Sequence, residues 1–370
     1  MSVLTHSEVF GRSIRKGDWN DQIVSTYQKI QNAIKDGDKD DAKEYIEYFD
    51  VEAAVCYKLY AQWHADAERY LLEKGMTPED LQGTCDDLKV LVNCWYEDGV
   101  PYDRDLELKE YRRLKARLLR ELNAPSQTAL RTLEEWKEQW RKLHDLDVDY
   151  VCGLFNAVQT HHGETGLEEM YRDYVIGDLF TFRYERFDVS KNDWKDVIDS
   201  LIYVSIEAMR GHLVGPERDG TMDFRDYDDR VELEFHPCAS GGRSMAGDHI
   251  SGTPSRHEAP YYYAPVQQKH DFSWNKTGVC NYCIHCAILM EKMPMEKFGY
   301  PVRVVDAPVY PENKTGRCKW TLYKDPRSVP ESAYERMGEK KPAADEPLGS
   351  ATRSADTDNE DKRGDQTRFL

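Results

Sequence analysis

The sequence predicts an α+β protein in which a mostly helical bundle is followed by a small antiparallel sheet. Residues 20–215 repeat apolar side chains with a period of about 3.6 and are divided by glycine- and proline-rich breaks. Residues 216–337 instead contain short runs in which polar and apolar side chains alternate, as they do in half-buried strands. We therefore expect a helical domain and then an α+β domain, and we expect the second to carry a cysteine- and histidine-rich metal site.

The helical region should begin after an N-terminal arm formed by residues 1–19. Its breaks delimit about seven helices. One start is marked by Thr77 and Pro78, because threonine caps the free N–H groups of a first turn and proline fits the first helical position. Another break is expected at His162-Gly163.

The second region is built from strands and one long loop. Residues 230–235 alternate as a strand and lead directly into His236-Pro-Cys238. Residues 239–278 have no clear period and predict a loop. Residues 282–298 look helical, and residues 301–306 and 317–323 predict a hairpin. Residues 338–370 are charged and poor in apolar side chains, so we expect a disordered tail.

The charge of the chain narrows the choice of partners. Its formal charge of −18, from 50 Lys and Arg against 68 Asp and Glu, argues against nucleic acid or an anionic membrane as a partner. No apolar run approaches the ~18 to 20 residues of a spanning helix, and the first residues do not resemble a signal peptide. We expect a cytoplasmic protein, and so large a helical layer is compatible with a homodimer.

Five of the nine cysteines lie between Cys238 and Cys318. Cys280, Cys283 and Cys286 follow one another at three-residue spacing, and Cys238 stands upstream at the end of a predicted strand. In a reducing compartment this spacing favours metal binding over disulfides. We expect zinc held by Cys238, Cys283 and Cys286. The fourth position is open to Cys280, His285, His236, His270 or water.

Other roles for these cysteines stay open. If Cys280 is a ligand, four thiolates are available, and the spacing also fits a [4Fe–4S] cluster. A redox-active Cys-x-x-Cys pair is disfavoured because the βαβ context is missing. Cys318 lies inside a predicted strand and is expected in the core.

The segment after Cys238 has the composition of an anion-binding loop. Gly241 and Gly242 allow backbone N–H groups to turn toward a ligand, and Ser240 adds a hydroxyl group. Arg243 can bind a carboxylate or phosphate through two parallel hydrogen bonds. The alternative is a flexible turn after the strand.

Two histidines are candidates for acid–base chemistry, because an imidazole titrates near neutral pH. His212 ends the last helix before the strand region, and His285 lies inside the cysteine run. The alternative role for His285 is a hydrogen-bond donor that holds a thiolate in place.

Residues 230–325 resemble a known type of domain. The order of Phe235-His-Pro-Cys238, the run from Cys283 to Glu291, the strand after Pro301 and the hairpin with Cys318 is similar to L-2-amino-thiazoline-4-carboxylate hydrolase-like and vinyl-reductase-like α+β domains. The resemblance implies a domain that is associated with a metal or binds a small molecule. The sequence departs from that pattern between Cys238 and Arg243 and in its doubled cysteine pair.

Three functions are compatible with these observations. The first is a zinc-dependent hydrolase or lyase that acts on a small anionic molecule held by the loop from Ser240 to Arg243. The second is an iron–sulfur protein with a redox or lyase role. The third is a binding or regulatory module with structural zinc. Structural zinc sites usually have two balanced ligand pairs, so the split arrangement favours an open, reactive metal.

Overall fold

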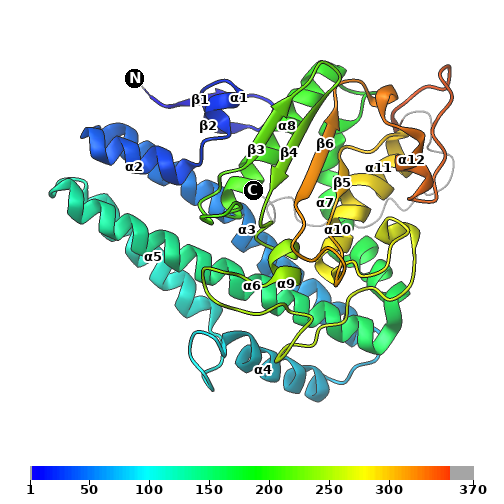
Figure 1. Ribbon diagram of the computed structural model, residues 1–370, viewed down its shortest axis with the longest axis horizontal. Coiled ribbons are helices and arrows are strands. Elements are labelled where there is room, and N and C mark those ends of the chain that lie inside the picture. The colour runs from blue at the N-terminus through cyan, green and yellow to red at the C-terminus, as the bar shows by residue number, and fades with distance from the viewer. Residues whose placement is uncertain (1, 351–370) are drawn as a thin grey trace.

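Long helices form the larger part of the fold, shown in Figure 1 as a computed structural model that describes residues 2–350. The helices of the bundle are α2 (Thr26–Asp36), α3 (Lys39–Glu73), α4 (Pro78–Asn93), α5 (Arg104–Glu121) and α6 (Ser126–Met170). The Thr77 side chain caps α4 by accepting a hydrogen bond from the Asp80 N–H, as predicted. The predicted break at Gly163 is a kink inside α6, where the glycine has φ 72°.

Helix α8 joins the bundle to the sheet. It spans Trp194–Gly211 and follows a π-helical turn (Tyr171–Val175), α7 (Gly177–Arg183) and a 3-10 turn (Tyr184–Phe187). It contacts both α3 and β6, and in Figure 1 it lies behind the strands. Because its buried residues serve both neighbours, His212 at its end lies where bundle and sheet meet.

The sheet has four antiparallel strands in the order β3-β4-β6-β5. Their bounds are β3 (Asp223–Asp226), β4 (Arg230–Phe235), β5 (Val304–Asp306) and β6 (Cys318–Tyr323). These bounds confirm the predicted strand at 230–235 and the predicted hairpin. Phe235 pairs with Cys318, so the end of β4 lies beside the start of β6.

The connections around the sheet contain more helix than expected. The predicted loop 239–278 includes helix α9 (Gly241–Ala246) and a 3-10 turn (Asp271–Ser273). The helical run predicted at 282–298 is confirmed but divided into a 3-10 turn (Asn281–Cys283), α10 (Ile284–Ala287), a π-helical turn (Ile288–Lys292) and α11 (Met293–Phe298). A 3-10 turn (Pro326–Ser328) and α12 (Glu331–Glu335) follow the sheet.

Both ends of the described chain are folded onto the body. The expected arm contains a hairpin of β1 (Leu4–Ser7) and β2 (Arg12–Arg15), and then α1 (Trp19–Gln22). In the segment expected to be disordered, Glu339 accepts a hydrogen bond from Lys292 and the Gly349 N–H donates to the Phe298 carbonyl, at 2.8 Å each. Residues 338–350 therefore pack against the fold, and the rest of that segment lies outside the described residues.

One continuous core spans the two predicted domains. Buried residues from α3, α6 and α8 belong to the same apolar cluster as those of β4 and β6. The boundary expected at 215/216 thus marks a change of secondary structure and not a gap in the core. Within residues 2–350, no helix combines the length and apolar character needed to cross a membrane.

Candidate functional site

Five side chains from distant parts of the chain meet where the helices face the sheet. We call them the imidazole–hydroxyl cluster: Tyr60 of α3, His144 of α6, His212 after α8, Ser240 before α9, and Tyr282. The Nδ1 atom of His212 lies 2.8 Å from His144 Nε2, 3.2 Å from the Tyr60 hydroxyl and 3.5 Å from Ser240 Oγ. The Tyr60 and Tyr282 hydroxyls are 2.9 Å apart. Two predicted site residues, Ser240 and His212, are therefore brought together.

Hydrogen bonds assign the proton positions of the two histidines. His144 Nδ1 lies 3.0 Å from Asp145 Oδ1, and a carboxylate only accepts, so Nδ1 donates and Nε2 is left as an acceptor. His212 Nδ1 must then donate to His144 Nε2. This leaves a lone pair on His212 Nε2, which has no hydrogen-bond partner within the described chain, and the residue is partly exposed. Burial lowers the pKa of both histidines, so both rings are neutral at pH 7.

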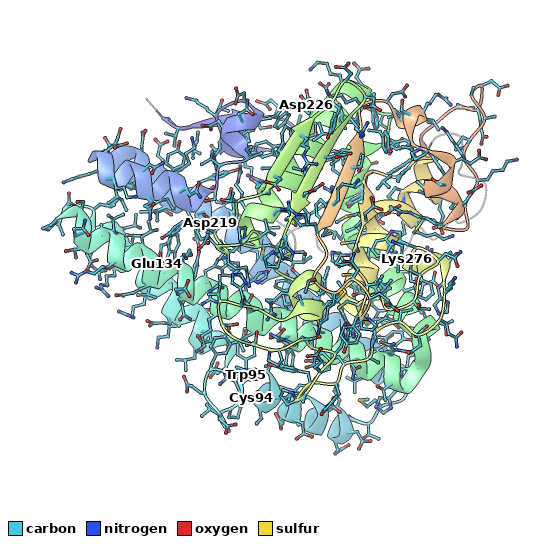
Figure 2. All side chains as sticks on the ribbon, in the orientation of Figure 1. Cys94, Trp95, Glu134, Asp219, Asp226 and Lys276 are labelled. Atoms are coloured by element: carbon cyan, nitrogen blue, oxygen red, sulfur yellow. The ribbon has the colours of Figure 1, made fainter. Side chains whose placement is uncertain are left out.

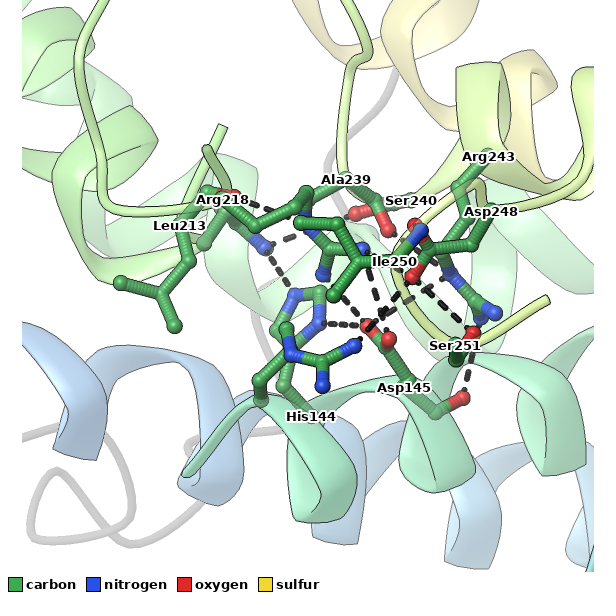
Figure 3. Close-up of polar contacts among 12 residues, drawn as sticks. His144, Asp145, Leu213, Arg218, Ala239, Ser240, Arg243, Asp248, Ile250 and Ser251 are labelled. Carbon is green, nitrogen blue, oxygen red and sulfur yellow. Dashed lines mark hydrogen bonds and ion pairs between the residues drawn. The ribbon is translucent and has the colours of Figure 1, made fainter. Parts of the chain in front are cut away.

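A buried ion-pair network holds Asp145 in its charged form (Figure 3). Arg218 donates to Asp145 at 2.6 Å and to Asp248 at 2.9 Å. Although burial alone would raise the pKa of Asp145, Arg218 and Arg243 hold it well below the usual range. The charged carboxylate in turn fixes the orientation of His144.

The role expected for Arg243 does not fit its surroundings. The side chain is fully buried, and its guanidinium donates to the Asp149 carboxylate and, at 3.1 Å, to the Asp145 carbonyl. A second carboxylate, that of Asp145, lies 3.5 Å away. Asp149 also accepts from Arg256 at 2.8 Å. Arg243 is therefore part of the internal ion-pair network and is not free to bind an anionic ligand.

The glycines of the predicted anion loop serve close packing against cysteines. A Cβ atom on Gly241 would lie 2.2 Å from Cys283 Sγ, and one on Gly242 would lie 3.0 Å from Cys238 Cβ. Only glycine allows the backbone to approach the thiols so closely. The two glycines thus help to form the cysteine site, and no contact with a cofactor is needed to explain them.

Four cysteines lie near one another where β4 ends and β6 begins, and we call them the thiol cluster: Cys238, Cys283, Cys286 and Cys318. Burial raises the pKa of Cys286 and Cys318, and the nearby Cys238 raises both further. Cys318, expected in the core, is buried but adjoins the other three because it pairs with Phe235, close to Cys238. Among the side chains that the structure describes, no group of three or more His, Cys, Asp or Glu residues is arranged to hold a metal ion.

The other candidate ligands differ in their surroundings. Cys280 is buried and lies near Cys152 and Cys283, and its thiol donates to Asn281 Oδ1 at 3.8 Å. His236 is exposed, and His270 lies 2.7 Å from Glu164. Cys94 lies beside α4, away from the sheet (Figure 2). Of the candidates for a fourth ligand, Cys280 therefore lies near Cys283, whereas His236 and His270 have other surroundings.

His285 and Cys286 form a thiol–imidazole pair beside the imidazole–hydroxyl cluster. His285 Nδ1 donates to the Tyr282 carbonyl at 2.6 Å, so Nε2 accepts from the Cys286 thiol at 3.3 Å. Burial lowers the pKa of His285 to about 4 and raises that of Cys286 well above its usual value. The pair is therefore neutral, and both residues are partly exposed.

No protein-family model, curated protein or solved structure matches this chain. The roles of its residues therefore follow from their own geometry. The resemblance of residues 230–325 to α+β domains stays a prediction.

The sequence did not indicate the residues that hydrogen-bond with His212 and fix the position of its proton. Tyr60, His144 and Asp145 lie inside long helices, where their periodic surroundings gave no sign of chemistry. One signal was present: His144-Asp-Leu-Asp-Val-Asp149 places three carboxylates within a run of α6 that is buried throughout. Charged residues in a buried helical run need partners, and they mark a polar network.

Proposed function

We propose that this chain is an enzyme, a hydrolase or lyase, that acts on a small anionic molecule with His212 as general base. The observation that supports this proposal is the hydrogen-bonded chain Asp145–His144–His212. It ends in an Nε2 lone pair that no described residue occupies. A base that is oriented by a second group and a buried carboxylate is the arrangement that acid–base catalysis requires.

The two reaction classes share their first step. His212 Nε2 takes a proton either from water that attacks the substrate or from the substrate itself. As the ring gains positive charge, the charge is stabilised through His144 by the Asp145 carboxylate. A neutral histidine is ready to accept a proton at pH 7 without first losing one.

The hydroxyl groups around His212 supply hydrogen-bond donors for negative charge that develops on the substrate. Burial raises the pKa of Tyr60 and Tyr282 well above the usual value, so both stay protonated. Ser240 Oγ lies 3.4 Å from the Tyr60 hydroxyl and 3.5 Å from His212. Donors held in position inside a protein stabilise an oxyanion more strongly than water does.

Replacement of His212 tests the proposal. We expect His212→Gln to lower turnover by about 10²- to 10⁴-fold, the usual contribution of a general base. Hydrolysis is measured as nitrophenolate release from p-nitrophenyl hemisuccinate, an anionic ester. Proton abstraction is measured by NMR as deuterium exchange into the methyl group of pyruvate.

His249→Gln is the matched control, because the His249 side chain is 64 % exposed and lies outside the cluster. It should leave both rates unchanged. The proposal is wrong if neither reaction exceeds the buffer rate, or if His212→Gln reacts as fast as the unaltered protein.

A second candidate is supported by the convergence of the thiol cluster. We propose that zinc binding draws the thiols of Cys238, Cys283 and Cys286 together, with Cys318 as the fourth ligand, because the described side chains are not yet arranged to hold a metal ion. Burial disfavours the thiolate forms in the metal-free protein, and a bound cation would offset that cost. Zinc bound here would either polarise a substrate carbonyl or stabilise the fold.

Metal analysis of the purified protein separates these possibilities. If the thiol cluster binds zinc, we expect about one equivalent per chain, lost in Cys286→Ser and kept in Cys280→Ser and Cys94→Ser. A brown protein that loses its colour in Cys280→Ser would instead indicate an iron–sulfur cluster. Metal-free protein that keeps its His212-dependent activity would exclude a catalytic metal.

A further inference from the structure

Arg303 is a buried cation beside the candidate site. It directly precedes β5, and only 6 % of its surface is exposed. Its Nε donates to Ser205 Oγ at 2.7 Å, and its guanidinium lies 5.1 Å from the centre of the Trp320 ring. The Tyr184 hydroxyl lies close to the same guanidinium. All three of these partners are neutral.

The lack of an acidic partner sets Arg303 apart. Within residues 2–350, every other arginine that is equally buried has a carboxylate in ion-pair contact: Arg15, Arg141, Arg210, Arg218, Arg243 and Arg256. Arg303 has no carboxylate within 4 Å among the described side chains, which leave out those of residues 178 and 182. Holding a cation out of water without a counter-charge is costly. An unpaired buried charge of this kind is typical of a binding site, where the ligand supplies the opposite charge.

Arg303 adjoins the segments that carry the candidate site. Its backbone N–H donates to the Met290 carbonyl at 3.3 Å, in the π-helical turn that follows Cys286 and α10. The Trp320 ring beside its guanidinium lies 5.1 Å from the ring of Phe235, the residue of β4 that leads to Cys238. An anion bound at Arg303 would therefore lie next to the segment of His285 and Cys286, both of which are partly exposed.

We propose that Arg303 binds the carboxylate group of the substrate and so takes the role that sequence analysis gave to Arg243. The inference rests on the proposed function, because it names the substrate class of that site. The planar guanidinium matches a carboxylate through parallel hydrogen bonds. Tyr184 provides a further donor, and the Trp320 ring holds the guanidinium in place.

The surroundings favour a carboxylate over a phosphate. Arg303 contributes one positive charge, which a monoanionic group neutralises. No second cation is in contact with Cys286 or His285 among the described residues. A phosphate dianion would leave one negative charge uncompensated in a buried setting.

The test compares Arg303→Met and Arg303→Lys with the control Arg317→Gln, an exposed arginine at the start of β6. Succinate is titrated as its monomethyl ester, which carries one carboxylate, at constant ionic strength, and binding is followed by calorimetry and by the unfolding temperature. Succinate should bind the unaltered protein and Arg317→Gln and raise their unfolding temperatures. Affinity should fall at least about tenfold in Arg303→Met and less in Arg303→Lys, which keeps the charge.

Arg303→Met should also unfold at the same temperature as the ligand-free protein or higher, because it removes an uncompensated buried charge. If Arg303→Met lowers the unfolding temperature of the ligand-free protein, Arg303 stabilises the fold and the inference is wrong. Equal succinate binding by Arg303→Met, or tighter binding of inorganic phosphate than of succinate, would also overturn it. If succinate binding depends on Arg303 but no reaction depends on His212, the proposed function fails and the carboxylate site stands.

Discussion

Asp145→Asn should destabilise the protein by about 3 to 5 kcal/mol, the cost of breaking a buried ion pair from one side. Asp145 is fully buried and accepts from Arg218 at 2.6 Å and from His144 at 3.0 Å, while Arg243 lies 3.5 Å away. Asparagine keeps the shape but removes the charge, which leaves buried cations without compensation. Urea unfolding at pH 7 measures the change in the free energy of unfolding.

The matched control for this prediction is Asp199→Asn. Asp199 pairs with Lys195 at 3.0 Å, but its side chain is 50 % exposed, so its loss should cost less than about 1 kcal/mol. An Asp145→Asn protein as stable as this control would show that the carboxylate does not neutralise the network. The same variant should lower any His212-dependent rate, because the amide no longer fixes the His144 proton on Nδ1.

Stability should fall steeply as the pH drops from about 6.5 toward about 4. Burial lowers the pKa of His64 and His285 to about 4 and also lowers that of His144, His212 and His257. In this range the unfolded chain takes up protons that the folded protein does not, so acid favours unfolding. Each histidine contributes up to about 1.4 kcal/mol per pH unit until the folded protein also becomes protonated.

Urea unfolding at several pH values between 7.5 and 4.5 checks this expectation. The variant His64→Gln should show a shallower dependence on pH, because the His64 side chain is only 12 % exposed. The exposed control His249→Gln should follow the unaltered protein. A free energy of unfolding that stays constant between pH 7 and 5 would mean that these histidines are not held neutral.

Local patterns were sufficient for most of the fold. The strand at 230–235, the hairpin of β5 and β6 and the cap at Thr77 were confirmed because each depends on alternation or turn chemistry within a few residues. Helix α9 was missed because Gly241 and Gly242 are poor helix formers, and tertiary packing against the thiols overrides that preference. The hairpin of β1 and β2 was missed for a similar reason, since four-residue strands carry little periodic signal.

The site was predictable only as a set of residue types. Sequence indicated Ser240, His212, His285 and the cysteines, because these residues are uncommon and lie in unusual spacing. It could not choose between Arg243 and Arg303, since that choice depends on which arginine meets a carboxylate. Asp149, which pairs with Arg243, lies 94 residues away in the chain.

The sequence by itself determined where helices and strands form and which segment carries the cysteines, since these follow from the order of neighbouring residues. Only the tertiary structure decided how the polar groups are paired. It placed Asp145, His144 and His212 in one hydrogen-bonded chain, and it gave the other buried arginines of the described chain a carboxylate partner but not Arg303. The physical reason is that desolvation and charge depend on distance in space, and segments remote in sequence supply both.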